Sequence, residues 1–112
     1  MDLEFYRDAA GDPRAHCKGP GAMMAGFLES DLQGSVESAQ EVLCAIDGVK
    51  SGKIPEWERT GNAYTLAVTP EGAILWNEMD VEIEPYKISL ADLRQAVADW
   101  VSFVEDDRGY WY

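Results

Sequence analysis

The spacing of apolar residues constrains this fold most, because it changes between two periods along the chain. A period of two is typical of half-buried strands, whereas a period near 3.6 is typical of helices that cover a core. The chain of 112 residues shows the first period, then the second, and then repeats both. This pattern predicts the order β-β-α-β-β-α.

Two hairpins are predicted. Residues 3–7 alternate and are followed by a turn-rich segment, so that residues 14–18 can pair back with them. Residues 62–69 and 73–76 form the second pair, and the connector 53–61 precedes them. In this interpretation the last strand continues in the same alternation through Met79, Val81 and Ile83.

Two helices are predicted. The first covers about residues 23–49, and Gly34 is a candidate break in it, because glycine in a helix interior costs about 1 kcal/mol relative to alanine. The second begins after Ser89, a good N-cap with Asp92 three residues on, and its apolar stripe runs to about Val104. We therefore expect one two-layer α+β domain over residues 1–112, with an antiparallel sheet of about four strands and both helices on one face.

Composition restricts the function more than the fold. The chain has 9 Lys and Arg against 21 Asp and Glu, a formal net charge of −12, and 46% hydrophobic residues. Such a charge repels phosphates, so we expect neither nucleic acid nor membrane as a partner, and it favours a basic protein instead. No catalytic motif, phosphate loop or dinucleotide fingerprint occurs, so we expect no enzyme and no cofactor.

The cysteines and the N-terminus suggest a cytoplasmic protein. No signal peptide and no apolar run of membrane-spanning length occur in the sequence, so Cys17 and Cys44 are expected to be reduced thiols. With one histidine and no CxxC motif, a metal site is not expected. His16 and Cys17 are neighbours on a strand and should point to opposite faces, which excludes them as a catalytic pair.

An acidic row is the most distinctive candidate site. If the segment after Trp76 is a strand, four carboxylates line one of its faces: Glu78, Asp80, Glu82 and Glu84. Such a row suits docking onto a basic surface, or mimicry of a phosphate backbone. The alternatives are a solvated face, charge that prevents edge-to-edge aggregation, or a weak divalent-cation site. Tyr86 would add an aromatic anchor.

Acidic and aromatic residues elsewhere give further candidates. The acidic residues of the first helix are interpreted as a solvated face. They are Glu29, Asp31, Glu37 and Glu41. They would contribute to docking, Glu37 and Glu41 in particular, only if they lie beside the acidic row. Trp57, Trp76 and Trp100 are expected to be buried or partly buried. The acidic and aromatic tail over residues 105–112 ends in Tyr110-Trp111-Tyr112, which either folds back onto the sheet or anchors a partner.

Two motifs resemble the YacL family of small acidic bacterial proteins. They are Met1-Asp2-x-Glu4-Phe5-x-Arg7-Asp8 and Trp57-x-Arg59-x-Gly61-x-x-Tyr64-Thr65-Leu66. The resemblance implies a bacterial cytosolic protein without an established activity, and it assigns no catalytic residue. By size and charge alone, the chain also resembles immunity proteins of contact-dependent growth inhibition and other toxin systems.

These observations lead to two expectations of function. The first is an immunity-type binding protein that neutralises a cationic bacterial toxin, in particular a nuclease domain, through protein–protein docking. The alternative is a YacL-like housekeeping protein that binds another cytosolic partner or a small ligand. In both, the protein is expected to be a monomer or a weak dimer.

Overall fold

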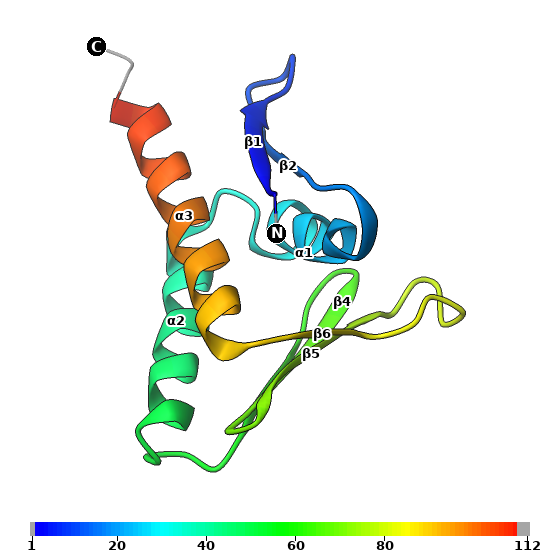
Figure 1. The fold of residues 1–112 in the computed structure, drawn as a ribbon. Helices are drawn as coiled ribbons and strands as arrows, with labels where there is room; N and C mark the ends of the chain where they lie inside the picture. The colour runs from blue at the N-terminus through cyan, green and yellow to red at the C-terminus, as the bar shows by residue number, and fades with distance from the viewer. Residues whose placement is uncertain (1, 110–112) are drawn as a thin grey trace.

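The computed structural model describes the backbone of residues 2–109 and the side chains of residues 2–105. The predicted tail anchor Tyr110-Trp111-Tyr112 lies outside the described residues. The elements, labelled in Figure 1, are β1 (Glu4–Arg7), β2 (Pro13–His16), the 3-10 turn η1 (Gly19–Gly21), α1 (Ala22–Phe27), the π-helical segment η2 (Leu28–Leu32), α2 (Val36–Lys50), β3 (Trp57–Thr60), β4 (Tyr64–Thr69), β5 (Gly72–Asn77), β6 (Tyr86–Ile88) and α3 (Leu90–Gly109).

The fold is α+β, as predicted, but the described chain has two antiparallel sheets instead of one. Strands β1 and β2 pair only with each other, and β3-β4-β5-β6 form a four-stranded meander. The first hairpin packs against α3, where the Phe5 ring lies 5.1 Å from the Trp100 ring and 5.5 Å from the Phe103 ring between centroids. This apolar contact takes the hairpin away from the larger sheet.

Two strand predictions were wrong. The predicted connector 53–61 contains β3, a short edge strand in which Trp57 pairs with Val68. The predicted acidic strand over residues 78–84 is a loop, because β5 ends at Asn77 and β6 begins only at Tyr86. The interpretation that the last strand continues in alternation through Met79, Val81 and Ile83 is therefore wrong, and all three side chains are exposed.

The first predicted helix is broken, as expected from Gly34. The helical run of α1 and η2 ends at Leu32, and the next residue, Gln33, has a positive φ of 52°. Helix α2 begins after Ser35, whose Oγ accepts the Ser38 N–H at 3.1 Å. The indole Nε1–H of Trp100 donates to the Gln33 carbonyl oxygen at 2.7 Å. The last helix therefore satisfies a backbone group at this break.

The start of the last helix is confirmed, and its end is later than predicted. Ser89 Oγ accepts the Asp92 N–H at 3.1 Å, which is the expected N-cap. The helix then runs to Gly109 and not only to about Val104. None of the helices in the described part of the chain is long and apolar enough to cross a membrane.

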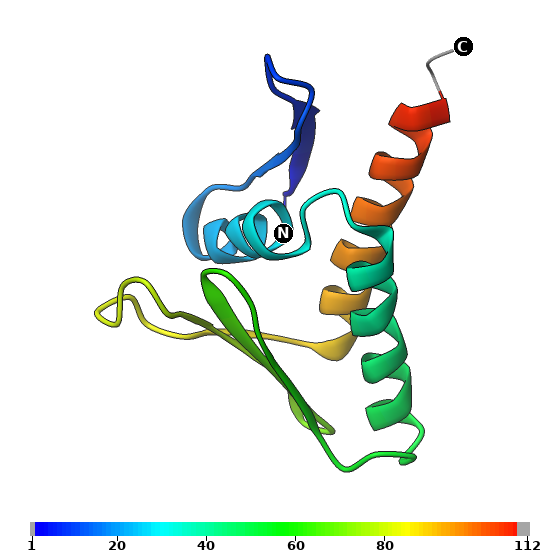
Figure 2. The ribbon, with the colours of Figure 1, turned by 180° about the vertical axis from the view of Figure 1, so that it is seen from behind.

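The core lies between the helices and one face of the four-stranded sheet. Figures 1 and 2 show α1, α2 and α3 on the same side of the β3–β6 sheet, with the other face uncovered. Trp100 is 1% exposed, whereas Trp57 and Trp76 are half-buried. The largest fully buried side chains are Trp100, Phe27, Met24, Leu28, Leu32, Ile46, Leu66, Leu75 and Leu93.

Candidate docking loop

The candidate docking loop is the segment 78–85 that joins β5 to β6 and projects from the sheet, as Figures 1 and 2 show in yellow. Its shape follows from local hydrogen bonds. Asn77 Oδ1 accepts the N–H groups of Met79 at 2.8 Å and Asp80 at 3.1 Å. Asp80 Oδ1 accepts the N–H of Glu82 at 3.1 Å. Asn and Asp side chains that bond to the following backbone in this way favour turns over strands.

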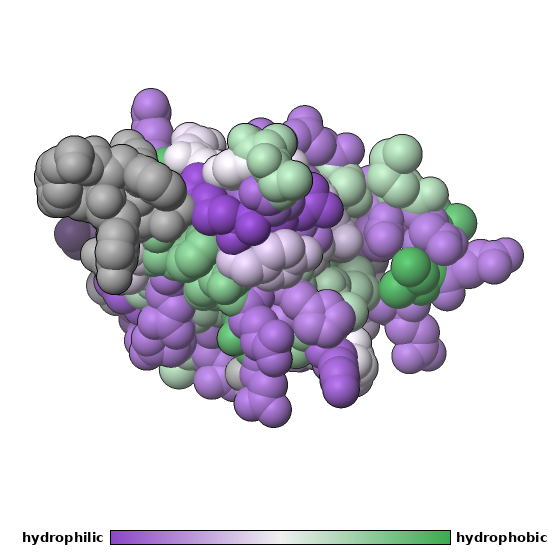
Figure 3. Space-filling model, turned by 90° about the horizontal axis from the view of Figure 1, so that it is seen from above, coloured by the Kyte–Doolittle hydropathy of each residue, from purple (hydrophilic) through white to green (hydrophobic). Residues whose placement is uncertain are grey.

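Apolar side chains at the loop tip are unusually exposed. Met79 is 77% exposed, Val81 88% and Ile83 42%. Single exposed apolar residues are common on protein surfaces, but three in five residues form a small apolar patch. Figure 3 shows hydrophobic side chains beside hydrophilic ones at this end of the molecule, at the right of the view.

Carboxylates share this tip with the apolar side chains. Glu78, Asp80, Glu82 and Glu84 are all exposed. Within the described residues, no Lys or Arg forms an ion pair with any of the four, so their negative charge faces solvent. The prediction sorted charged and apolar side chains onto opposite faces of a strand, whereas the loop presents both kinds together.

The other candidate residues lie elsewhere. Glu37 and Glu41 are on α2, which is at the opposite side of the molecule from the loop in both Figures 1 and 2, so they do not join the acidic tip. Tyr86 begins β6 but lies in a separate pocket of about 650 Å³ with Cys17 and Asp92. Burial raises the pKa of the Tyr86 hydroxyl, and Cys17 and Asp92 raise it further. Tyr86 is therefore not positioned as an anchor beside the acidic tip.

The prediction that His16 and Cys17 point to opposite faces agrees with the structure. His16 is exposed at the end of β2, while Cys17 next to it is buried. Cys17 and Cys44 are both free thiols. Among the described residues, no group of three or more His, Cys, Asp or Glu side chains could hold a metal ion.

One group of polar residues was missed by sequence reasoning, which placed Glu29 and Asp31 on a solvated face. Asp31 is only 6% exposed, and Glu29 forms an ion pair with Arg14, with 2.6 Å between Oε2 and Nε. A Cβ atom on Gly61 would overlap the Asp31 carboxylate, so only glycine allows the turn after β3 to approach so closely. Arg59 also borders this space. Arg59, Gly61 and Tyr64 all belong to the motif that begins at Trp57, so this motif was the sequence feature that could have indicated the group.

Comparisons with known proteins give a family. A family model described as an uncharacterised protein family, UPF0231, matches residues 1–93. A curated UPF0231 protein of Proteus mirabilis strain HI4320 is 30% identical over 71 residues, which are 63% of this chain and 57% of that protein. The matched segment thus spans less than two thirds of the relative. No solved structure matches the chain.

Proposed function

The chain belongs to the uncharacterised protein family UPF0231, and from its β5–β6 loop we propose that it is a binding protein that docks onto a basic protein partner. The single observation that carries the proposal is the joint exposure of apolar and acidic side chains at the loop tip. The sequence motifs predicted a bacterial family without an established activity, and membership of UPF0231 agrees with that prediction. The name YacL and the likeness to immunity proteins stay predictions.

The two kinds of side chain have different roles in docking. Burying a valine, isoleucine or methionine side chain stabilises a complex by about 1.5–3 kcal/mol, so Met79 and Val81 would supply affinity. The carboxylates of the loop would steer the protein to a positive surface and accelerate association. The partner surface that fits is an apolar hollow with Lys and Arg at its rim.

In the narrower form of this proposal, the basic partner is the nuclease domain of a toxin. A nuclease must present a positive cleft to its phosphate substrate, and a protein with a net charge of −12 is attracted to that cleft. In this form the protein is an immunity-type inhibitor, and the loop enters or covers the cleft. Inhibition of nucleic-acid cleavage by the purified protein would separate this form from the broader one.

The family membership favours a second candidate, a housekeeping protein that binds another cytosolic partner or a small ligand. The curated relative carries only the family description in its name, so it points to no toxin. The position of the gene distinguishes the two candidates. A toxin gene directly beside it favours immunity, and a solitary gene favours the housekeeping role.

The experiment compares three variants of the protein for binding to a partner captured from the native host, identified and then purified. Val81→Ser removes an apolar contact, and the double variant Glu82→Lys with Glu84→Lys reverses charge at the tip. We expect each to weaken binding about ten-fold or more. We also expect wild-type association to slow as salt is raised from about 50 to 500 mM.

The matched control is the double variant Glu37→Lys with Glu41→Lys, which makes the same charge change on α2, away from the loop. It should bind far better than the loop double variant. The proposal is wrong if the control loses as much affinity as the loop variants, or if the purified partner is acidic and binds independently of salt.

A further inference from the structure

The uncovered face of the four-stranded sheet has a regular pattern of side chains. Residues directly opposite each other on paired strands point to the same face, and alternate residues point to opposite faces. The register pairs Glu58 with Ala67, Ala67 with Ile74, and Ile74 with Lys87. These four residues therefore form one row across the outer face, with an acid at one edge and a base at the other.

The two central strands carry side chains of different size on this face. The outward residues of β4 are small or medium, Thr65, Ala67 and Thr69, and those of β5 include the large Ile74 and Trp76. Small residues beside larger ones should leave a hollow around Ala67 and Thr69 on β4 and a ridge along β5. Thr65, beside Trp76, is only 7% exposed and adds no open surface.

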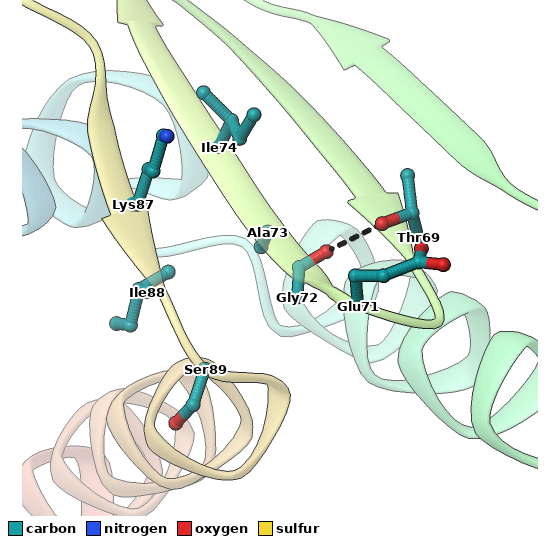
Figure 4. Close-up of a pocket in the computed structure, with 8 residues that line it drawn as sticks. All are labelled: Thr69, Glu71, Gly72, Ala73, Ile74, Lys87, Ile88 and Ser89. Atoms are coloured by element: carbon teal, nitrogen blue, oxygen red, sulfur yellow. Dashed lines mark hydrogen bonds between the residues drawn. The ribbon is translucent and has the colours of Figure 1, made fainter.

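The edge of this row is open to solvent. Figure 4 shows the side chains of Ile74 and Lys87 projecting to the same side of the sheet, while Ser89 lies at the start of α3. A shallow pocket of about 480 Å³ lies at this edge and includes both Ile74 and Lys87 in its wall. Ile74 is half-buried and Lys87 is exposed.

We propose that this face binds a second copy of the chain, with a two-fold axis parallel to the strands and between β4 and β5. Such an axis exchanges the two edges of the row. Glu58 of each copy then lies opposite Lys87 of the other, and Ala67 lies opposite Ile74. The ridge of β5 on one copy fits the hollow of β4 on the other, at the spacing of about 10 Å that is usual between stacked sheets.

Charge supports a second copy as the occupant of this face. Within strands β3–β6 the outward-facing charged residues are Glu58 and Lys87, so the face is neutral although the chain carries −12. Isologous contact requires a self-complementary surface, and this row has that property. The rotation leaves the two β5–β6 loops at the same end of the strands, on either side of the axis.

The expected dimer is weak. The four strands have 4, 6, 6 and 3 residues and cover roughly 300 Å² at the usual strand spacing and rise per residue. Stable interfaces commonly bury about 800 Å² on each partner. We therefore expect self-association in the range of tens to hundreds of micromolar, which also fits the repulsion between two strongly acidic chains.

Sedimentation velocity over about 10–500 µM at physiological salt tests the proposal. The wild-type mass should rise with concentration from 12.4 kDa towards twice that value. Glu58→Lys places two lysines opposite each other, and Lys87→Glu places two glutamates opposite each other, so each variant alone should self-associate about ten-fold more weakly. Mixing the two variants in equal amounts restores both opposite-charge pairs and should restore the dimer.

Circular dichroism of each variant confirms that folding is retained, which is expected because both residues are exposed. A wild-type chain that stays monomeric at 500 µM overturns the proposal. A dimer that is unaffected by either single variant overturns the choice of face. A dimer that both variants weaken but their mixture does not restore overturns the two-fold arrangement and indicates a different occupant of this face.

Discussion

The Asp31 carboxylate accepts the backbone N–H of Tyr64, with 3.2 Å between Oδ2 and the nitrogen. Its other oxygen accepts the N–H of Ala63 at 3.0 Å. Asp31 belongs to the π-helical segment η2, and the two N–H groups belong to Ala63, just before β4, and to Tyr64, its first residue. A buried carboxylate therefore joins the first helical layer to the sheet.

Asp31→Asn should destabilise the protein by about 1–3 kcal/mol. The asparagine side chain keeps the shape but has only one acceptor oxygen, so its NH₂ group would face a backbone N–H and leave it unpaired. Urea unfolding, followed by tryptophan fluorescence, measures the difference. Asp12→Asn is the matched control, because Asp12 is exposed and its substitution should change stability by less than about 0.5 kcal/mol. Equal stability of the two variants would show that the Asp31 contacts contribute nothing.

The pairing of Asp47 with Arg94 should make stability depend on acid pH. Arg94 Nε and Nη2 donate to the two carboxylate oxygens of Asp47 at 2.9 and 3.0 Å, which joins α2 to α3. The hydrogen bonds from Arg94 are the largest effect and lower the pKa of Asp47 below its ordinary value of 3.8. Desolvation opposes them as the second effect, and the charges of Arg94 and Lys50 lower the pKa further. Because the folded-state pKa is lowered, the stabilisation is present above 3.8 and is lost as pH falls through the folded-state pKa.

Replacing Arg94 by Met should raise the pKa of Asp47 towards that ordinary value, measured by NMR titration of the carboxyl carbon. Wild type and variant should converge in stability at the acid end of the titration. Lys53→Met removes the same charge elsewhere and should leave the Asp47 titration unchanged. An Asp47 titration that is identical with and without Arg94 would contradict the ion pair.

Serine substitutions of Met79 and Val81 should change the free energy of unfolding by less than about 0.5 kcal/mol, because both side chains are exposed in the loop. Leu75→Ala on the preceding strand should cost about 2–5 kcal/mol, since Leu75 is 1% exposed. This comparison tests whether residues 78–84 form a loop, as in the structure, or a strand, as the sequence pattern predicts. A loss of more than about 2 kcal/mol on substitution of Val81 would indicate a side chain in the core.

Elements with a strong periodic pattern or a specific capping residue could be predicted from the sequence. The cap at Ser89 and the break near Gly34 depend on local chemistry, which the sequence displays directly. The hairpin of β4 and β5 was predictable because a glycine turn separates two alternating runs.

The errors came from interactions that sequence patterns do not display. The alternation after Trp76 continues to Ile83, but the side chains of Asn77 and Asp80 bond to nearby N–H groups and turn the backbone. The burial of Asp31 depends on a turn about thirty residues later, so its own helical context could not reveal it. Likewise, the separate sheet of β1 and β2 depends on Phe5 meeting α3 at the far end of the chain.

The bond from Trp100 to Gln33 and the packing of Phe5 on the same indole have a consequence for synthesis. Both partners of Trp100 leave the ribosome more than sixty residues before it does. The N-terminal hairpin and the break before α2 must therefore wait for α3 before they reach their final packing. We conclude that the core is completed only after nearly the whole chain has been translated, so the nascent N-terminal half exposes apolar surface in the interval.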